Sequence, residues 1–187
     1  ENARRAIELD PTDPSSRRIY AYALVWVGRT DEAIDQLEQA VQLNPNLAGP
    51  YFELAGLYRA RAGQSEDTVM AQELYASSIA LYEQILAMQP ENARAYLRLC
   101  DAYFEARENR RASDYCLEAV TINPQYAQAW ASLGQTQYSQ RNYEGAIESF
   151  EQCVALAGDD ADIRCYYLRG LAHYYLGDCD DAWGILS

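Results

Sequence analysis

The 187-residue chain has no lysine, so all fifteen of its basic residues are arginine, and it has a single histidine. It also has no run of eighteen apolar residues, which argues against a membrane-spanning helix. The formal net charge of −13 argues against a nucleic-acid backbone or an anionic lipid surface as the partner, because both need a basic protein surface. Neither nucleic acid nor an anionic lipid surface is therefore the expected partner.

Five cysteines are present, but they follow no metal or disulfide pattern. Their number is odd and no Cys-x-x-Cys pair occurs among Cys100, Cys116, Cys153, Cys165 and Cys179. Zinc sites and disulfide frameworks both favour clustered or evenly numbered cysteines. We therefore predict reduced, buried thiols in a cytoplasmic protein that binds no metal and needs no cofactor.

A catalytic constellation is missing as well. Nucleophilic or acid–base catalysis needs a nucleophile, a base and an orienting group that converge in a pocket. The single histidine, His173, lies at a helical position suited to packing, and no glycine-rich phosphate loop follows a strand. The sequence predicts a protein without enzymatic activity.

What the chain does have is a period. Prolines close the similar phrases "IELDP", "VQLNP", "LAMQP" and "VTINP" at positions 11, 45, 90 and 124, so the separations are 34, 45 and 34 residues. Within a period the apolar spacing is helical, with Trp130, Leu133 and Tyr138 on one helix and Ala146 and Phe150 on the next. A fixed period of this length is typical of a solenoid of helical hairpins.

These residues carry a resemblance. A pair of helices in 34 residues, with Trp130-x2-Leu133-Gly134 followed by Ala146-x3-Phe150, resembles the tetratricopeptide repeat family. The same positions hold Tyr51-x2-Leu54-Ala55 and Tyr96-x2-Leu99-Cys100. The resemblance implies an all-α, right-handed superhelix of antiparallel helical hairpins.

The repeats divide the chain as a single array. Residues 1–13 end one repeat, full repeats cover 14–47, 48–92, 93–126 and 127–162, and residues 163–187 form a partial repeat. Because each unit of a solenoid buries its face on its neighbours, we expect this piece to be flanked by further repeats in its parent protein.

The resemblance also implies that side chains of the first helices line a concave groove. Its candidate residues are Tyr22, Arg59, Arg94, Arg98, Asp101, Phe104, Tyr138 and Tyr174, with Ser132, Gln135 and Arg164 at further groove positions.

Two readings of these groove residues stay open. Phe104, Tyr138 and Tyr174 recur at one position and suit an extended peptide, or else they pack between helices. Arg94 and Arg98 share a helix face and resemble a carboxylate-binding pair, or else they form a solvated face in which Arg94 pairs with Asp101. Glu53 would repel a carboxylate, so we do not predict capture of chaperone tails.

The separation of 45 contains eleven extra residues, which is about three helical turns. We predict one extended helix over 66–88, with Gly63 closing the helix before it and Ser65 as its N-cap. The overhang candidates are Val69, Met70, Leu74 and Tyr75. They either pack on their own chain or form a surface for a partner or a second copy.

The sequence thus predicts a scaffold that binds a peptide or an extended protein segment in its concave groove. One alternative is self-association through helix 66–88 or the solenoid ends. Another is a regulatory or docking segment of a larger enzyme.

Overall fold

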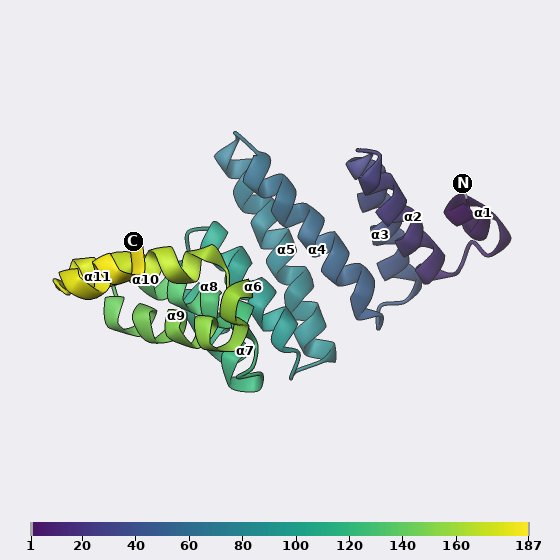
Figure 1. The fold of residues 1–187 in the computed structure, drawn as a ribbon. Helices are drawn as coiled ribbons and strands as arrows, with labels where there is room; N and C mark the ends of the chain where they lie inside the picture. Colours follow the sequence, from purple (N-terminus) through teal and green to yellow (C-terminus); the bar gives the residue numbers. More distant parts are fainter. Residues whose placement is uncertain (1, 187) are drawn as a thin grey trace. The chain divides into compact units, whose positions relative to one another are not determined.

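The computed structural model describes residues 2–186, apart from the side chain of Ala3. Within that range every regular element is helical, with eleven α-helices and one short 3₁₀ helix (Figure 1). The chain divides into two compact units, unit 1 (Glu1–Pro90) and unit 2 (Glu91–Ser187), each with its own core. The predicted all-α fold of helical hairpins is therefore confirmed.

Unit 1 contains two full hairpins, α2 against α3 and α4 against α5. Their bounds are α1 Asn2–Leu9, α2 Pro14–Trp26, α3 Thr30–Leu43, α4 Ala48–Gln64 and α5 Thr68–Met88. Asp13 caps α2 by accepting hydrogen bonds from the backbone amides of Ser15 and Ser16, which satisfies donors that a helix start leaves open. Small residues face large ones in the core, with Ala21 and Ala33 beside Leu24 and Leu37.

Unit 2 contains the hairpins α6–α7, α8–α9 and α10–α11. Their bounds are α6 Ala93–Glu105, α7 Asn109–Ile122, α8 Ala127–Ser139, α9 Tyr143–Ala157, η1 Gly158–Asp160, α10 Ile163–Leu176 and α11 Cys179–Leu186. Ala131, Ala146 and Phe150 form its buried cluster together with Cys153 and Cys165. None of the helices in residues 2–186 is both long enough and apolar enough to cross a membrane.

Helix ends follow the repeat. α3, α5 and α7 end at Leu43, Met88 and Ile122, each two residues before a proline, as expected because proline disfavours helical geometry in the residue before it. The turn inside four hairpins holds a residue with positive φ at the same repeat position: Gly28 (78°), Arg107 (68°), Arg141 (63°) and Gly177 (89°). The left-handed turn is thus a property of the repeat and not of glycine alone.

The α4–α5 hairpin corrects the prediction of a single extended helix. α4 has 17 residues where α2 has 13, and α5 has 21 where α3 has 14, so four and seven residues account for the eleven extra ones. Gly63 lies inside α4, and the N-cap of α5 is Asp67, which accepts from the amides of Val69 and Met70. One added turn and two added turns each keep their helix in phase, so the insertion lengthens the hairpin as a whole.

The cysteines also correct the sequence prediction. Disulfides join Cys100 to Cys116 and Cys153 to Cys165, and only Cys179 is a free, exposed thiol. The prediction of reduced thiols is therefore wrong for four of the five cysteines. The first bridge spans 16 residues between α6 and α7 with Cα atoms 5.1 Å apart, and the second spans 12 residues between α9 and α10 with Cα atoms 6.4 Å apart.

A close contact at the same spacing in the other two hairpins of unit 2 explains the first bridge. Gly134 and Phe150 are also 16 residues apart, and a Cβ on Gly134 would lie 2.6 Å from the Phe150 ring. Gly170 meets Leu186 at the same separation, again with a 2.6 Å approach. The two helices of these hairpins approach each other closely at this pair of positions, and in α6–α7 a covalent bond takes the place that the Phe150 ring has in α8–α9.

Candidate functional site

A pocket of about 240 Å³ opens on unit 2, where the first helices of three successive hairpins meet. Its lining mixes carboxylates, an amide, hydroxyls, a guanidinium and one aromatic ring. The residues are Cys100, Asp101, Phe104 and Glu105 of α6, Ser132, Gln135 and Thr136 of α8, and Arg164 of α10.

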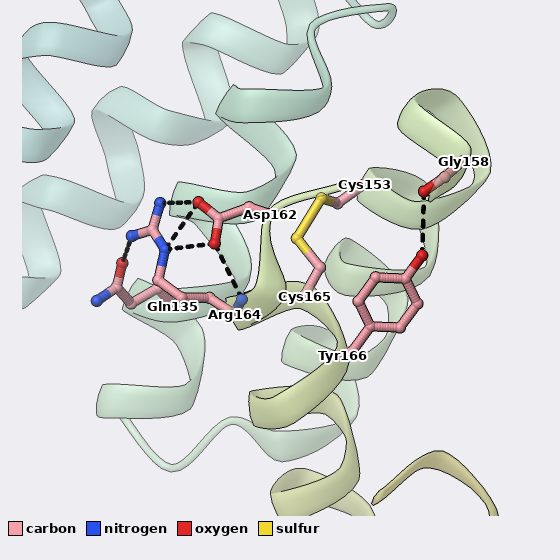
Figure 2. The surroundings of a disulfide bond; sticks show 7 residues. All are labelled: Gln135, Cys153, Gly158, Asp162, Arg164, Cys165 and Tyr166. Carbon is pink, nitrogen blue, oxygen red and sulfur yellow. Dashed lines mark hydrogen bonds and ion pairs between the residues drawn. A yellow bond between two sulfur atoms is a disulfide. The ribbon is translucent and has the colours of Figure 1, made fainter. Parts of the chain in front are cut away.

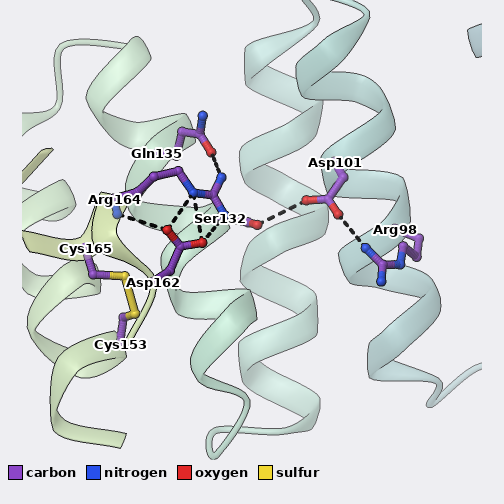
Figure 3. Close-up of polar contacts among 8 residues, drawn as sticks. All are labelled: Arg98, Asp101, Ser132, Gln135, Cys153, Asp162, Arg164 and Cys165. Atoms are coloured by element: carbon purple, nitrogen blue, oxygen red, sulfur yellow. Dashed lines mark hydrogen bonds and ion pairs between the residues drawn. A yellow bond between two sulfur atoms is a disulfide. The ribbon is translucent and has the colours of Figure 1, made fainter. Parts of the chain in front are cut away.

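Asp101 joins α6 to α8 at one side of the pocket. Its Oδ2 accepts a hydrogen bond from Arg98 Nη1 at 3.1 Å, and its Oδ1 accepts one from the Ser132 hydroxyl at 3.1 Å (Figure 3). The structure thus pairs Asp101 with Arg98, one turn earlier on the same helix. Both side chains are largely covered, with 27% of Arg98 and 17% of Asp101 exposed, so their charges compensate each other within the wall.

Arg164 forms the opposite side. Its guanidinium donates to both carboxylate oxygens of Asp162, with Nη2 at 2.6 Å, and its Nη1 donates to the amide oxygen of Gln135 (Figure 2). Asp162 also caps α10 by accepting from the Arg164 amide. Hydrogen bonding to Asp162 raises the pKa of Arg164, and the guanidinium in turn holds the pKa of Asp162 below its usual value.

Both disulfides lie next to this pocket. Cys100 is one of its lining residues, and Cys165 directly follows Arg164 in α10 (Figure 3). The Cys153–Cys165 bridge ties the start of α10 to α9. Each bridge therefore fixes a backbone segment that presents a charged pocket residue, since Asp101 follows Cys100 and Arg164 precedes Cys165.

The three residues of the predicted aromatic row lie in three different surroundings. Phe104 lines the pocket. Tyr138 belongs to a tyrosine cluster in which the rings of Tyr143 and Tyr175 stack at 5.0 Å and Tyr138 meets both of them edge-on. Burial and the neighbouring tyrosines raise the pKa of Tyr138. Tyr174 is 61% exposed and lies beside Trp183 on an apolar hollow between α10 and α11.

The remaining groove candidates lie outside the pocket. Tyr22, on α2 of unit 1, is half exposed and donates its hydroxyl hydrogen to Glu53 at 2.8 Å. Arg59 is a partly buried residue of α4, and Arg94 is an exposed residue of α6. The pocket thus brings together Asp101 and Phe104 with Ser132, Gln135 and Arg164. Arg98 is not among the lining residues but donates a hydrogen bond to Asp101.

The overhang candidates fall into two pairs. Leu74 and Tyr75 are partly buried against the lengthened α4, where Gly63 approaches the Tyr75 hydroxyl. Val69 and Met70, at the start of α5, are 64% and 50% exposed.

Sequence reasoning missed Cys100, Glu105 and Thr136 as lining residues and Asp162 as the partner of Arg164. Asp162 had a signal, because an aspartate directly before a helix is a common N-cap. The Cys100–Cys116 bridge had one too, since its spacing equals that of Gly134 and Phe150 in the next repeat. Within residues 2–186, no group of three or more potential ligands could hold a metal ion.

Comparison with known families agrees with the hairpin geometry. Models of the tetratricopeptide repeat match residues 20–47, 69–136 and 127–160. The chain belongs to the tetratricopeptide repeat (TPR) family. The resemblance noted in the sequence is therefore confirmed.

Relatives of this TPR chain include named co-chaperones. It is 26% identical over 135 residues to the heat-shock protein cognate (HSC) co-chaperone sgt12 of Aspergillus fumigatus, a match that covers 67% of this chain and 40% of the relative. It is 27% identical over 159 residues to the DnaJ protein P58IPK homolog of Arabidopsis thaliana, covering 83% and 32%. The chain thus spans less than half the length of these curated relatives.

Solved structures show the same fold. The crystal structure of MamA superposes with a TM-score of 0.73 at 25% identity, covering 88% of this chain and 89% of that one. TPR proteins of this kind are protein-interaction scaffolds and are generally without enzymatic activity, so the coarse function predicted from the sequence is supported.

Proposed function

We propose that this TPR chain binds an extended peptide segment of a partner protein on the face of unit 2 formed by α6, α8 and α10. The observation that carries the proposal is the pocket itself, to which three successive first helices contribute side chains. A peptide that crosses these helices would contact one after another. Phe104 supplies an aromatic contact surface that binds at low entropy cost.

Capture of peptides from a random library tests this proposal. Phage that display random 12-residue peptides are selected on the immobilised chain, and the titre recovered is compared between variants. We expect Phe104→Ala to lower recovery about tenfold, because an aromatic contact of an interface contributes on the order of 1–2 kcal/mol.

Leu117→Ala is the matched control, since Leu117 is a 55% exposed apolar residue of α7, outside the pocket. Circular dichroism melting verifies that both variants fold. Equal recovery by wild type and Phe104→Ala would contradict binding on this face.

Self-association through the start of α5 is the second candidate, because Val69 and Met70 are exposed apolar neighbours there. Met70→Asp is the informative variant, since Leu74 and Tyr75 also pack within the hairpin. Sedimentation velocity should then show a concentration-dependent dimer for the wild type and a monomer for the variant. A wild type that stays monomeric throughout excludes this candidate.

We also propose that the chain resides in an oxidising compartment. Disulfides persist in oxidising compartments, so Cys100–Cys116 and Cys153–Cys165 favour such a compartment over the cytoplasm predicted from reduced thiols. A non-catalytic role for the chain, including docking for a larger enzyme, is consistent with its TPR fold. The sequence of the parent protein distinguishes a docking segment from a free-standing scaffold.

A further inference from the structure

The connection from α9 to α10 differs from the corresponding connection from α7 to α8. Pro124 follows α7, whereas Gly158, with a φ of 55°, takes this place after α9. From Cys100 to Gly134 the corresponding residues of successive first helices are 34 positions apart, and from Gly134 to Gly170 they are 36. Glycine and added length both give a chain segment more conformational freedom. The connection itself therefore restrains the start of α10 less than the start of α8.

The Cys153–Cys165 disulfide adds a restraint at this place, because it joins α9 to the first turn of α10 (Figure 2). The corresponding positions of α7 and α8, 34 and 36 residues earlier, hold Ala119 and Ala129. All four residues are buried. The shorter connection thus has two small side chains where the longer one has a covalent bond.

A hydrogen bond at the start of the first helix is common to both connections. The Trp130 indole donates to the carbonyl oxygen of Pro124 at 2.8 Å, and the Tyr166 hydroxyl donates to the carbonyl oxygen of Gly158 at 3.0 Å. Since both connections have this contact, it does not offset the extra freedom of the longer one. The disulfide is the restraint that α10 has and α8 lacks.

This restraint acts on the pocket through Arg164, the residue before Cys165 and the lining residue that α10 contributes. The Arg164 guanidinium donates to Gln135 of α8 and to Asp162. If the start of α10 moved away from α9, Arg164 would lose its contact with Gln135 and the pocket would lose one side. A peptide that crosses the three first helices would then contact only two of them.

The Cys100–Cys116 bridge has a different place, although Cys100 itself lines the pocket. It joins the two helices of one hairpin, α6 and α7. The corresponding residues of the next hairpin, Gly134 and Phe150, pack closely without a covalent bond. Loss of this bridge is therefore not expected to move one first helix relative to another.

We propose that the Cys153–Cys165 disulfide is the positioning element of the peptide site, so that peptide binding on unit 2 requires this bond and does not require Cys100–Cys116. The inference rests on the proposed function, since it names what regulates the same site. A dithiol such as dithiothreitol supplies two electrons and two protons. The Sγ–Sγ bond breaks, both cysteines become thiols, and the dithiol closes to its own cyclic disulfide.

The test measures the affinity of a fluorescently labelled synthetic peptide, taken from the phage selection on the oxidised wild-type chain, by fluorescence polarisation. The double variant C153A/C165A restores the alanine pair of the preceding connection and should bind about tenfold more weakly, as on loss of one strong interface contact. Dithiothreitol should weaken binding to the wild type equally. The matched control C100A/C116A should bind within about twofold of the wild type, and dithiothreitol should weaken its binding about tenfold.

A double-mutant cycle separates positioning from a general loss of stability. Arg164→Ala should weaken binding several-fold in the disulfide-bonded chain and cause no further loss in C153A/C165A, because the bond acts through the position of Arg164. Phe104→Ala, on α6, should weaken binding by the same factor in both backgrounds.

Circular dichroism at the assay temperature verifies that the variants are helical. If C153A/C165A loses its helical signal, the bond is needed for folding and the inference is overturned. It is also overturned alone if C153A/C165A binds the peptide as tightly as the wild type, or if Arg164→Ala weakens binding equally in both backgrounds. No enrichment of any peptide by the oxidised wild type overturns the proposed function and the inference together.

Discussion

Units 1 and 2 are built from the same hairpin, but their helices are held together by different chemistry. In unit 1 Ala21 and Leu37 lie sixteen residues apart in one buried cluster, and residues 1–90 contain no cysteine. In unit 2 the equivalent positions hold Cys100 and Cys116, which are bonded, and Cys153–Cys165 ties the next two hairpins together. The same kind of hairpin thus accommodates alanine with leucine, glycine with phenylalanine, or a disulfide at one pair of positions.

The units also differ in where they depart from the regular repeat. Unit 1 departs in length, because its α4–α5 hairpin is extended on both helices. Unit 2 keeps helices of 13–15 residues from α6 to α9. It departs in polarity, because its first helices converge on a pocket in which Asp101 is paired with Arg98 and Arg164 with Asp162. The lesson is that length and surface chemistry vary independently as long as the small residues at the helix contact are kept.

Reduction of the disulfides should produce the largest difference between the units. Closing loops of 16 and 12 residues stabilises the folded state by about 3 kcal/mol each in the chain-entropy account. Hydrogen exchange followed by mass spectrometry, with and without dithiothreitol, should show loss of protection in α7 and α9 and unchanged protection in α3. The variant Cys179→Ser should behave like the wild type. An equal loss of protection in α3 would contradict the prediction that the disulfides stabilise unit 2 alone.

Two glycines to alanine should shift stability in opposite directions. A Cβ on Gly134 in unit 2 would lie 2.6 Å from the Phe150 ring, so Gly134→Ala should destabilise by about 1–3 kcal/mol through overpacking. In unit 1 the nearest atom to a Cβ on Gly56 is the Tyr82 hydroxyl at 4.0 Å, so Gly56→Ala should stabilise α4 by roughly 0.5–1 kcal/mol. Urea unfolding measures both. Stabilisation by both substitutions would show that helix propensity outweighs packing at Gly134, and destabilisation by both would show that Gly56 is also too closely packed for a methyl group.

High pH should affect unit 1 through Tyr58. Burial and the hydrogen bond that Tyr58 donates to Glu38 at 2.6 Å raise its pKa from 10.0 to about 12. The unfolded chain releases this proton first, so the contribution is complete below about pH 10 and is lost as the pH rises toward 12. The loss should be on the order of 1 kcal/mol, because the site is partly exposed.

Comparison of wild type with Tyr58→Phe isolates this contribution from that of the other tyrosines. The difference in unfolding free energy between the two should shrink between pH 9 and pH 12. A difference that stays constant across this range would mean that the hydroxyl titrates normally.

The smallest effect is expected at the turns. Arg107 and Arg141 of unit 2 hold positive φ where unit 1 has Gly28, and a left-handed conformation costs a residue with a Cβ about 1 kcal/mol. Arg107→Gly and Arg141→Gly should therefore raise stability by several tenths of a kcal/mol to about 1, and Gly28→Arg should lower it by a similar amount. Thermal melts that rank these variants in the reverse order would indicate that the arginine side chains compensate through contacts of their own.

Much of the architecture could be read from the residues. The proline-closed period predicted the hairpins because each helix must bury a stripe of apolar side chains, and the spacing of Trp130, Leu133, Ala146 and Phe150 reports that stripe directly. The eleven-residue insertion was expected to keep helical phase, and it does. Its division could not be predicted, because four and seven residues are close to one and two turns and satisfy the pattern on either helix.

The candidate site was predictable only in part. Asp101, Phe104, Ser132, Gln135 and Arg164 were all expected on one face, since they recur at groove positions of the family resembled. Their hydrogen-bond partners were only partly predictable, because the contact between Asp101 and Ser132 joins two helices across 31 residues of sequence.

The sequence by itself determined the helical hairpin, its period and the small residues that let two helices approach, because these depend on local propensity and on the burial of one helix face. Only the tertiary structure decided which cysteines pair, since a disulfide needs Cα atoms within about 4–7 Å of each other. It also decided how the pocket is lined, with Asp101 paired to Arg98 and Arg164 to Asp162. Its members come from three helices that are far apart along the chain, and which charge meets which depends on distances that no local pattern encodes.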